Sequence, residues 1–188
     1  MEGTYAPLAD VLVADEDAPA TPDLVEILNY VRAANHGFHW VGDGRPISVN
    51  LLTELQGLLM RGTQLEGESG QLRATQVVIR RRVDAPVAAL PVQQARFVPP
   101  PPGGDLHVGL QQLMDWMRTD HRAEIDPVVA AAMSHYEFEA LHPFRDGNGR
   151  IGRLLIVLYM QSVGVLSEPT LHGAQGRGRA GDFVWSSQ

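Results

Sequence analysis

The sequence predicts a mostly α-helical fold with one small β element. Several segments repeat apolar residues at helical spacing, and most of them follow a residue that favours a helix N-cap. A single run, residues 74–83 ("ATQVVIRRRV"), has the β-branched composition of a strand. The chain of 188 residues is long enough for one buried core, and no segment of it repeats another. We therefore expect a single domain.

The first two expected helices each combine a cap with an apolar face. Residues 21–40 begin with Thr21 as N-cap and place apolar residues at helical spacing. Residues 47–62 show the same pattern, with Ser48 as N-cap and Gly62 as terminator. Both segments are therefore predicted to pack one side against the core.

The strand region and the later helices follow in order. Residues 74–83 are bounded by turn-forming residues, which favours a hairpin. Residues 97–104 ("FVPPPPGG") predict a stiff extended connector, because proline fits neither a ladder nor a helix interior. Residues 106–120 form the next amphipathic run. Residues 125–142 form another, with Asp126 as its N-cap.

The composition excludes several classes of protein. The formal net charge of −7 argues against nonspecific binding to nucleic acid, because Lys and Arg are the residues that grip a phosphate backbone. The absence of cysteine excludes disulfides and thiolate metal sites. No apolar run is long enough to span a membrane, and the first residues do not resemble a secretion signal. We therefore expect a cytoplasmic protein that binds neither nucleic acid nor membrane.

Residues 142–153, "HPFRDGNGRIGR", are the most informative stretch of the chain. Their proline and glycines indicate a bent loop, and the apolar run of residues 151–166 indicates a helix that the loop opens. A helix that begins near Gly149 leaves backbone N–H groups unpaired and carries a partial positive charge, which makes an anion site. Gly147 and Gly149 would let a ligand approach the backbone closely.

The polar side chains of this loop suit a phosphorylated ligand. Arg150 and Arg153 share a helix face on which they could hold neighbouring phosphate oxygens, and Asn148 can donate from its side chain. Asp146 would repel phosphates unless a divalent cation such as Mg²⁺ lay between them. His142 has a pKa range suited to accepting a proton from an attacking hydroxyl. Each residue alone is more often structural, but the joint pattern indicates phosphoryl or nucleotidyl transfer.

The loop resembles the signature of the Fic family, HxFx(D/E)GNGRxxR, and matches it at every defined position. The resemblance extends over residues 22–171 and includes "GQLRATQVVI", "FVPPPP" and "HYEFEALHPF". It implies the Fic fold, a helical bundle with a small β-hairpin flap beside the active-site loop. It also implies a protein adenylyltransferase, which transfers AMP from ATP to a Ser, Thr or Tyr hydroxyl of a target protein.

The resemblance implies a role for each residue of the loop that matches the signature. It implies that His142 deprotonates the target hydroxyl, that Phe144 anchors the loop in the core, and that Asp146 holds Mg²⁺. The residues that would bind the phosphates of ATP are Gly147, Asn148, Gly149, Arg150 and Arg153. The glycines and Asn148 would form the anion hole around the α- and β-phosphates, and Arg153 would meet the γ-phosphate.

Gly149 favours AMP transfer over phosphorylation, because family members that phosphorylate their targets resemble this loop but carry a lysine at this position. Two alternatives stay open: the transfer of another phosphate-containing group, and a nucleotide-binding module without turnover. The expected partners are ATP and a target protein, and the target could be the chain itself. The oligomeric state stays open, with a homodimer as one possibility.

The strand region would form the flap, over residues 75–98. By resemblance, an extended segment of the target would pair with one edge strand through main-chain hydrogen bonds. The residues of that strand are Thr75, Gln76, Val77, Val78, Ile79 and Arg80. The alternative is a solvated edge whose charges block aggregation.

The two ends of the chain carry separate expectations. Residues 1–15 resemble the tail of the inhibitory helix of one branch of the family, which bears (S/T)xxxE(G/N). Glu2 would be its glutamate and would pair with Arg153. Residues 1–171 are expected to form a single Fic domain, and the glycine-rich residues 172–188 a flexible tail.

Overall fold

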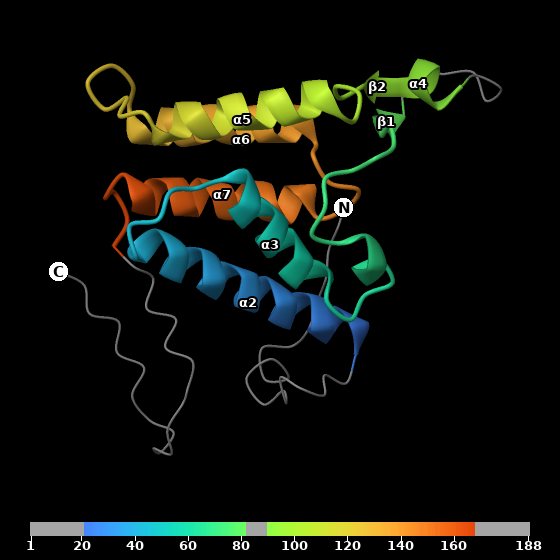
Figure 1. Ribbon diagram of the computed structural model, residues 1–188, viewed down its shortest axis with the longest axis horizontal. Helices are drawn as coiled ribbons and strands as arrows, with labels where there is room; N and C mark the ends of the chain where they lie inside the picture. The colour runs from blue at the N-terminus through green and yellow to red at the C-terminus, as the bar shows by residue number, and fades with distance from the viewer. Residues whose placement is uncertain (1–20, 82–89, 168–188) are drawn as a thin grey trace, which may run out of the picture.

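The computed structural model describes residues 21–81 and 90–167 (Figure 1). The proposed inhibitory residue Glu2, the rest of residues 1–15 and the tail of residues 172–188 lie outside the described residues, as does part of the flap region. Over the described segments the chain is mostly helical, as the sequence predicts.

The first two described helices begin where their caps predict. Helix α2 covers Pro22–Gly42 and helix α3 covers Val49–Met60. The side-chain oxygens of Thr21 and Ser48 each accept a backbone N–H three residues further on, at 3.2 Å. Gly62 follows the end of α3 with φ +70°, a conformation in which glycine carries no steric penalty. These caps and this terminator are confirmed.

The later helices also confirm the sequence pattern. Helix α5 covers Gly104–Arg118, helix α6 Pro127–Leu141 and helix α7 Asn148–Ser162. The carboxylate of Asp126 caps α6 by accepting the N–H of Val128 at 2.8 Å. A single 3₁₀ turn, η1 at Glu66–Glu68, lies between α3 and the first strand.

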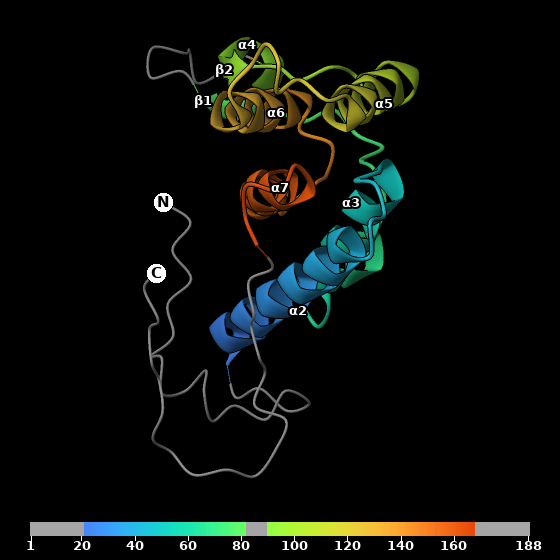
Figure 2. The same ribbon diagram turned by 90° about the vertical axis from the view of Figure 1, so that its left-hand side faces the viewer.

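Helix α7 is the centre of the molecule. It runs between α6 on one side and α2 on the other, with α5 beside α6 and α3 beside α2 (Figures 1 and 2). Its core side chains are at most 1% exposed; they are Ile151, Leu154, Leu155, Leu158 and Tyr159. Gly37 of α2 makes the close approach possible, because a Cβ there would lie 2.9 Å from Leu158 Cδ1. Helix α7, which begins within residues 142–153, is therefore held in place by the core.

The hairpin is real but shorter than the sequence predicts. Strand β1 covers Ile79–Arg81 and pairs antiparallel with β2 at Ala95–Phe97, and the short helix α4, Pro91–Gln94, directly precedes β2. The segment 75–78, expected as strand, is irregular. The ladder stops because residues 99–102, which follow β2, are prolines and have no N–H to donate.

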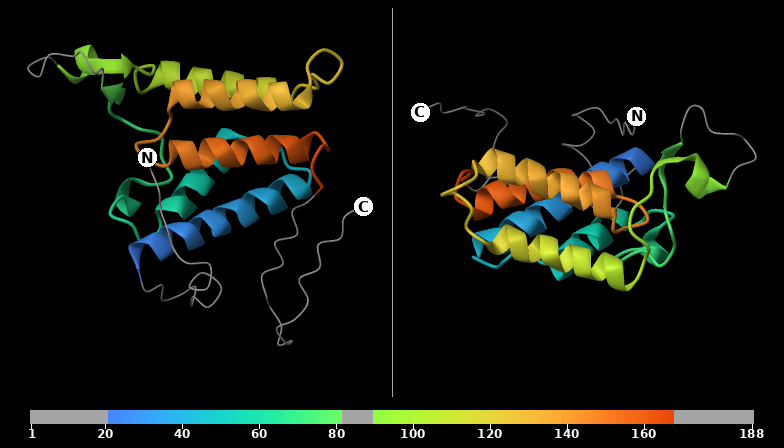
Figure 3. Two further views of the ribbon diagram at one scale, coloured as in Figure 1. Left: turned by 180° about the vertical axis from the view of Figure 1, so that it is seen from behind. Right: turned by 90° about the horizontal axis from the view of Figure 1, so that it is seen from above.

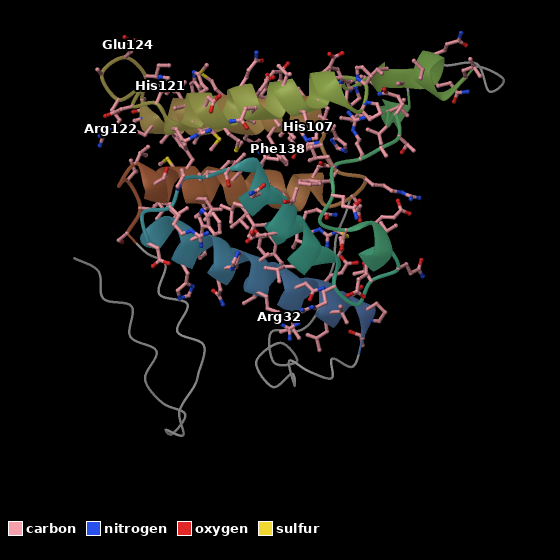
Figure 4. The ribbon with its side chains drawn as sticks, in the orientation of Figure 1. Arg32, His107, His121, Arg122, Glu124 and Phe138 are labelled. Atoms are coloured by element: carbon pink, nitrogen blue, oxygen red, sulfur yellow. The ribbon has the colours of Figure 1, made fainter. Side chains whose placement is uncertain are left out.

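The hairpin projects from the end of the helical body at which α6 ends and α7 begins (Figures 1 and 3). The α5–α6 connection, which carries His121, Arg122 and Glu124, lies at the opposite end (Figure 4). Within the described segments, no helix combines the length and apolar character that crossing a membrane requires.

Candidate active site

The loop between α6 and α7 begins with a left-handed turn at His142. This residue has φ 45° and ψ 61°, and it is the only non-glycine residue with positive φ in the described segments. Its N–H donates to Phe138 O at 3.0 Å, which closes the last turn of α6. Pro143 follows and cannot continue a helix. The chain therefore turns sharply at the predicted catalytic histidine.

Phe144 anchors the loop in the core, as the resemblance implies. Its side chain is fully buried, and its ring centroid lies 6.4 Å from that of Phe138. Phe138 points from α6 into the layer above α7 (Figure 4). Asn148 braces the same residue in both directions: Phe144 N–H donates to Asn148 Oδ1 at 2.9 Å, and Asn148 Nδ2 donates to Phe144 O at 2.8 Å.

These two hydrogen bonds correct one expectation from the sequence. The side chain of Asn148 is buried and engaged with Phe144, so it does not point a donor at a ligand. Asn148 is the first residue of α7, and its backbone N–H has no partner within the helix. The backbone of Asn148, and not its amide side chain, is the group that can contribute to an anion hole.

Asn148→Ala is expected to destabilise the fold by about 1–3 kcal/mol, because it leaves a buried N–H and a buried C=O of Phe144 without partners. Urea unfolding of the variant and the parent chain measures the difference. Asn50→Ala is the matched control, since Asn50 is exposed on α3 and should change the free energy of unfolding by less than about 0.5 kcal/mol. Equal stability of the two variants would contradict the bracing role of Asn148.

Gly147 is favoured chiefly by its backbone conformation. It has φ +82°, and a Cβ at this position would lie 2.8 Å from Met60 Cε. As N-cap of α7 it offers no side chain to the first N–H groups of the helix. Those groups therefore stay available at the positive end of the helix dipole, where an anion binds favourably.

The two arginines of the loop differ in their surroundings. Arg150 Nη1 lies 3.2 Å from Glu26 Oε2 on α2, and Arg150 Nη2 lies 3.5 Å from Asp146 Oδ2. Arg153 is exposed, and no hydrogen bond or ion pair joins it to another residue of the described part of the chain. Arg150 is thus oriented by two carboxylates, whereas Arg153 can turn towards a ligand.

The ring of His142 is mostly buried, with 24% of its side chain exposed. Its Nδ1 has no hydrogen-bond partner among the described residues and lies 3.9 Å from Glu139 Oε2, too far for a hydrogen bond. Burial lowers the pKa of His142 below the ordinary histidine value, and the carboxylate of Glu139 opposes this shift. The imidazole is therefore neutral near pH 7 and able to accept a proton.

Sequence reasoning missed two buried polar residues that support the loop. Gln56 of α3 donates from Nε2 to Asp146 O at 3.4 Å and accepts the N–H of Gly70 at Oε1. Arg73 is 5% exposed and donates to His142 O from Nε at 2.8 Å. One signal was present for Gln56, a polar residue on the buried face of an amphipathic helix. No local pattern marked Arg73.

The structure brings together the predicted loop residues His142, Asp146, Gly147, Asn148, Gly149, Arg150 and Arg153 between the end of α6 and the first turns of α7. The predicted flap strand lies at the same end of the molecule (Figure 1). It is joined to the loop through Arg73, which donates to Thr75 O at 3.3 Å.

Comparisons with known proteins identify the family of this chain. Residues 46–160 match the model of the Fic/DOC family. The protein adenylyltransferase Fic of Drosophila willistoni is 43% identical over 67 residues, which are 36% of this chain and 13% of that protein. Protein adenylyltransferase fic-1 of Caenorhabditis elegans is 35% identical over 97 residues, which are 52% of this chain and 16% of that protein. The chain therefore aligns with only a small part of these curated relatives.

Solved structures show the same fold. A Fic family protein from Desulfovibrio desulfuricans G20 is 28% identical, with a TM-score of 0.59 over 86% of this chain and 45% of that one. The family model covers more than half of the 188 residues and includes the whole loop from His142 to Arg153. This chain belongs to the Fic/DOC family.

Proposed function

We propose that this protein transfers AMP from ATP to a hydroxyl side chain of a target protein. The observation that carries the proposal is the position of His142, on a rigid left-handed turn directly before the open N-terminus of α7. Transfer of a phosphate-containing group to a hydroxyl requires a proton acceptor close to an anion site. The loop carries both. The relatives named as protein adenylyltransferases support AMP as the group transferred.

In the proposed reaction the target hydroxyl attacks the α-phosphorus of ATP. Its proton passes to His142, through the ring nitrogen other than the buried Nδ1. The bond from the α-phosphorus to the oxygen that bridges it to the β-phosphate breaks, and pyrophosphate leaves. The new bond joins the target oxygen to AMP.

The phosphates of ATP would lie at the start of α7. Backbone N–H groups of Gly147, Asn148 and Gly149 would bind the α- and β-phosphates, because these groups precede the first intrahelical hydrogen bonds. Arg150 would add a donor from a guanidinium that Glu26 already orients. Arg153 is exposed and would meet the γ-phosphate.

The carboxylate of Asp146 fits a Mg²⁺ ion that is shared with the phosphates. Its side chain is 42% exposed at the mouth of the loop. Mg²⁺ usually keeps several waters and takes one or two protein carboxylates together with substrate phosphates, so a single exposed carboxylate is a suitable donor. When bound, the ion would neutralise phosphate charge and so remove the repulsion between Asp146 and ATP.

The target would bind along the flap. Strands β1 and β2 form a two-stranded pair in the described segments, so β1 has a second edge at which an extended peptide can add. The segment that follows Arg73, itself bonded to His142 O, leads into that edge and consists of Thr75, Gln76, Val77, Val78, Ile79 and Arg80. A backbone-mediated contact of this kind would tolerate varied target sequences.

The group transferred can be tested with ATP labelled at either the α- or the γ-phosphate. The pure protein and a cell extract are each incubated with Mg²⁺ and one of the two labels. Protein labelled only from the α-position is the expected result. Label only from the γ-position would make the protein a kinase despite Gly149, and label from neither would favour a nucleotide-binding module without turnover.

The rate of transfer is expected to rise with pH as His142 loses its proton and to level off below the ordinary histidine range, because burial lowers the pKa of His142. Glu139→Gln removes a charge that raises this pKa, so the inflection should move to lower pH. Rates measured between pH 5 and 8 give both inflections. Glu137→Gln, an exposed change on the same helix, should leave the inflection in place. An inflection unchanged in Glu139→Gln would contradict the assignment.

A further inference from the structure

Arg73 lies between the flap and the catalytic turn and donates to both. Its Nε donates to His142 O at 2.8 Å, and its Nη2 donates to Leu141 O at 3.3 Å. On the flap side, Nη2 donates to Pro100 O at 2.6 Å and Nη1 to Thr75 O at 3.3 Å. One guanidinium therefore joins both sides of the base of the flap to the last residue of α6 and the first residue of the loop.

The main chain of Arg73 adds a further link. Its N–H donates to Pro143 O at 2.9 Å. Three consecutive carbonyls, those of Leu141, His142 and Pro143, thus accept hydrogen bonds from the same residue. This set holds the backbone exactly where His142 adopts its left-handed conformation, which a non-glycine residue rarely takes without support.

The surroundings of Arg73 indicate that its side chain holds the backbone in place. Arg73 is 5% exposed, and all of its side-chain hydrogen bonds in the described segments go to backbone carbonyls and none to a carboxylate. Burial without a counter-charge is unfavourable for a cation and lowers the pKa of Arg73. A planar group with five N–H donors can serve several carbonyls in fixed directions, whereas a lysine ammonium cannot.

We propose that Arg73 is a positioning residue that fixes the base of the flap and the His142 turn as one unit, so that a target segment paired with the flap presents its hydroxyl to the imidazole. This inference rests on the proposed AMP transfer and assigns Arg73 a part in aligning the target. The side-chain hydrogen bonds of Arg73 within the described segments all go to backbone carbonyls, so its proposed part is to hold the backbone and not to bind ATP. Its loss should therefore lower the turnover number and leave the affinity for ATP intact.

Arg73→Lys in the full chain tests the proposal, with Arg122→Lys as the matched control. Arg122 is exposed and pairs with Asp120 in the α5–α6 connection, at the far end of the molecule (Figure 4). For each protein, kcat is measured with α-labelled ATP, Kd for ATP by calorimetry, and Tm by thermal unfolding, with assays run well below the lowest Tm. The expected result is a fall in kcat of roughly 10–100-fold for Arg73→Lys, with Kd for ATP within about twofold of the parent.

A second variant acts on the flap alone and does not depend on how well Arg73→Lys folds. Gln76 donates from Nε2 to Pro99 O at 3.0 Å, a separate link across the base of the flap. Gln76→Ala should lower kcat in the same direction by a smaller factor, again at constant Kd for ATP. Because both residues act on one unit, the double variant should lose less than the product of the two single effects.

The outcomes separate this inference from the proposed function. Absence of α-label transfer by the parent chain would reject the proposed function itself. Transfer by the parent, together with parent-like kcat in both Arg73→Lys and Gln76→Ala, would overturn the positioning role alone. A fall in kcat accompanied by an equal loss of ATP affinity would also overturn it, because Arg73 would then support the phosphate site.

Discussion

Replacing His142 is expected to abolish AMP transfer while ATP still binds with nearly the parent affinity. In the proposed reaction the ring accepts a proton, and the phosphate contacts would come from the start of α7 and its arginines. Loss of a general base typically costs a factor of about 10²–10⁴ in rate. Turnover with α-labelled ATP and calorimetric titration of ATP measure the two quantities separately.

The choice of substitution at His142 matters because the residue has φ 45°. Asparagine tolerates the left-handed region better than alanine, so His142→Asn preserves the turn while it removes the imidazole. Both His142→Ala and His142→Asn should be inactive. His39→Ala is the control, since His39 is exposed on α2 and lies outside the loop. Equal loss of ATP affinity and turnover in both His142 variants would contradict the role of His142 as base.

Phe144→Ala is expected to lower the free energy of unfolding by about 3–5 kcal/mol, a large part of the 5–15 kcal/mol that holds a typical domain folded. The side chain is fully buried against Phe138, so truncation leaves a cavity under the loop as well as lost apolar contact. Urea unfolding gives the loss directly. Activity should fall with it, because the loop is anchored at this residue.

Two further variants serve as comparisons for the unfolding free energy of Phe144→Ala. Phe144→Leu keeps most of the apolar volume and should lose less stability than Phe144→Ala. Tyr136→Ala removes an aromatic side chain that is 74% exposed on the same helix as Phe138, and it should change the free energy of unfolding by less than about 0.5 kcal/mol. A Phe144→Ala protein as stable as Tyr136→Ala would show that the loop is not anchored in the core.

The elements that the sequence predicted well are those set by local chemistry. Thr21, Ser48 and Asp126 are caps whose side chains bond within two or three residues, so the cap and its helix stand next to each other in the chain. The loop of residues 142–153 was identifiable for the same reason, because its glycines, proline and charged groups are contiguous.

The features that the sequence did not reveal depend on contacts between distant segments. Arg73 bonds to His142 across 69 positions, and Gln56 to Asp146 across 90. The predicted strand of residues 74–83 was too long, because prolines that follow the partner strand β2 end the ladder. Pairing with a distant segment sets this limit, and a local pattern does not show it. The role of Asn148 was misjudged in part, since only the fold shows that its amide is bound to Phe144.

The most direct test of the central claim is peptide mass spectrometry of the protein and its targets after incubation with Mg²⁺ and ATP, for the parent chain and His142→Asn side by side. The account predicts AMP attached to the hydroxyl of a serine, threonine or tyrosine in the parent reaction and unmodified peptides with His142→Asn. A phosphate in place of AMP, or AMP attached equally well without the imidazole, would contradict it.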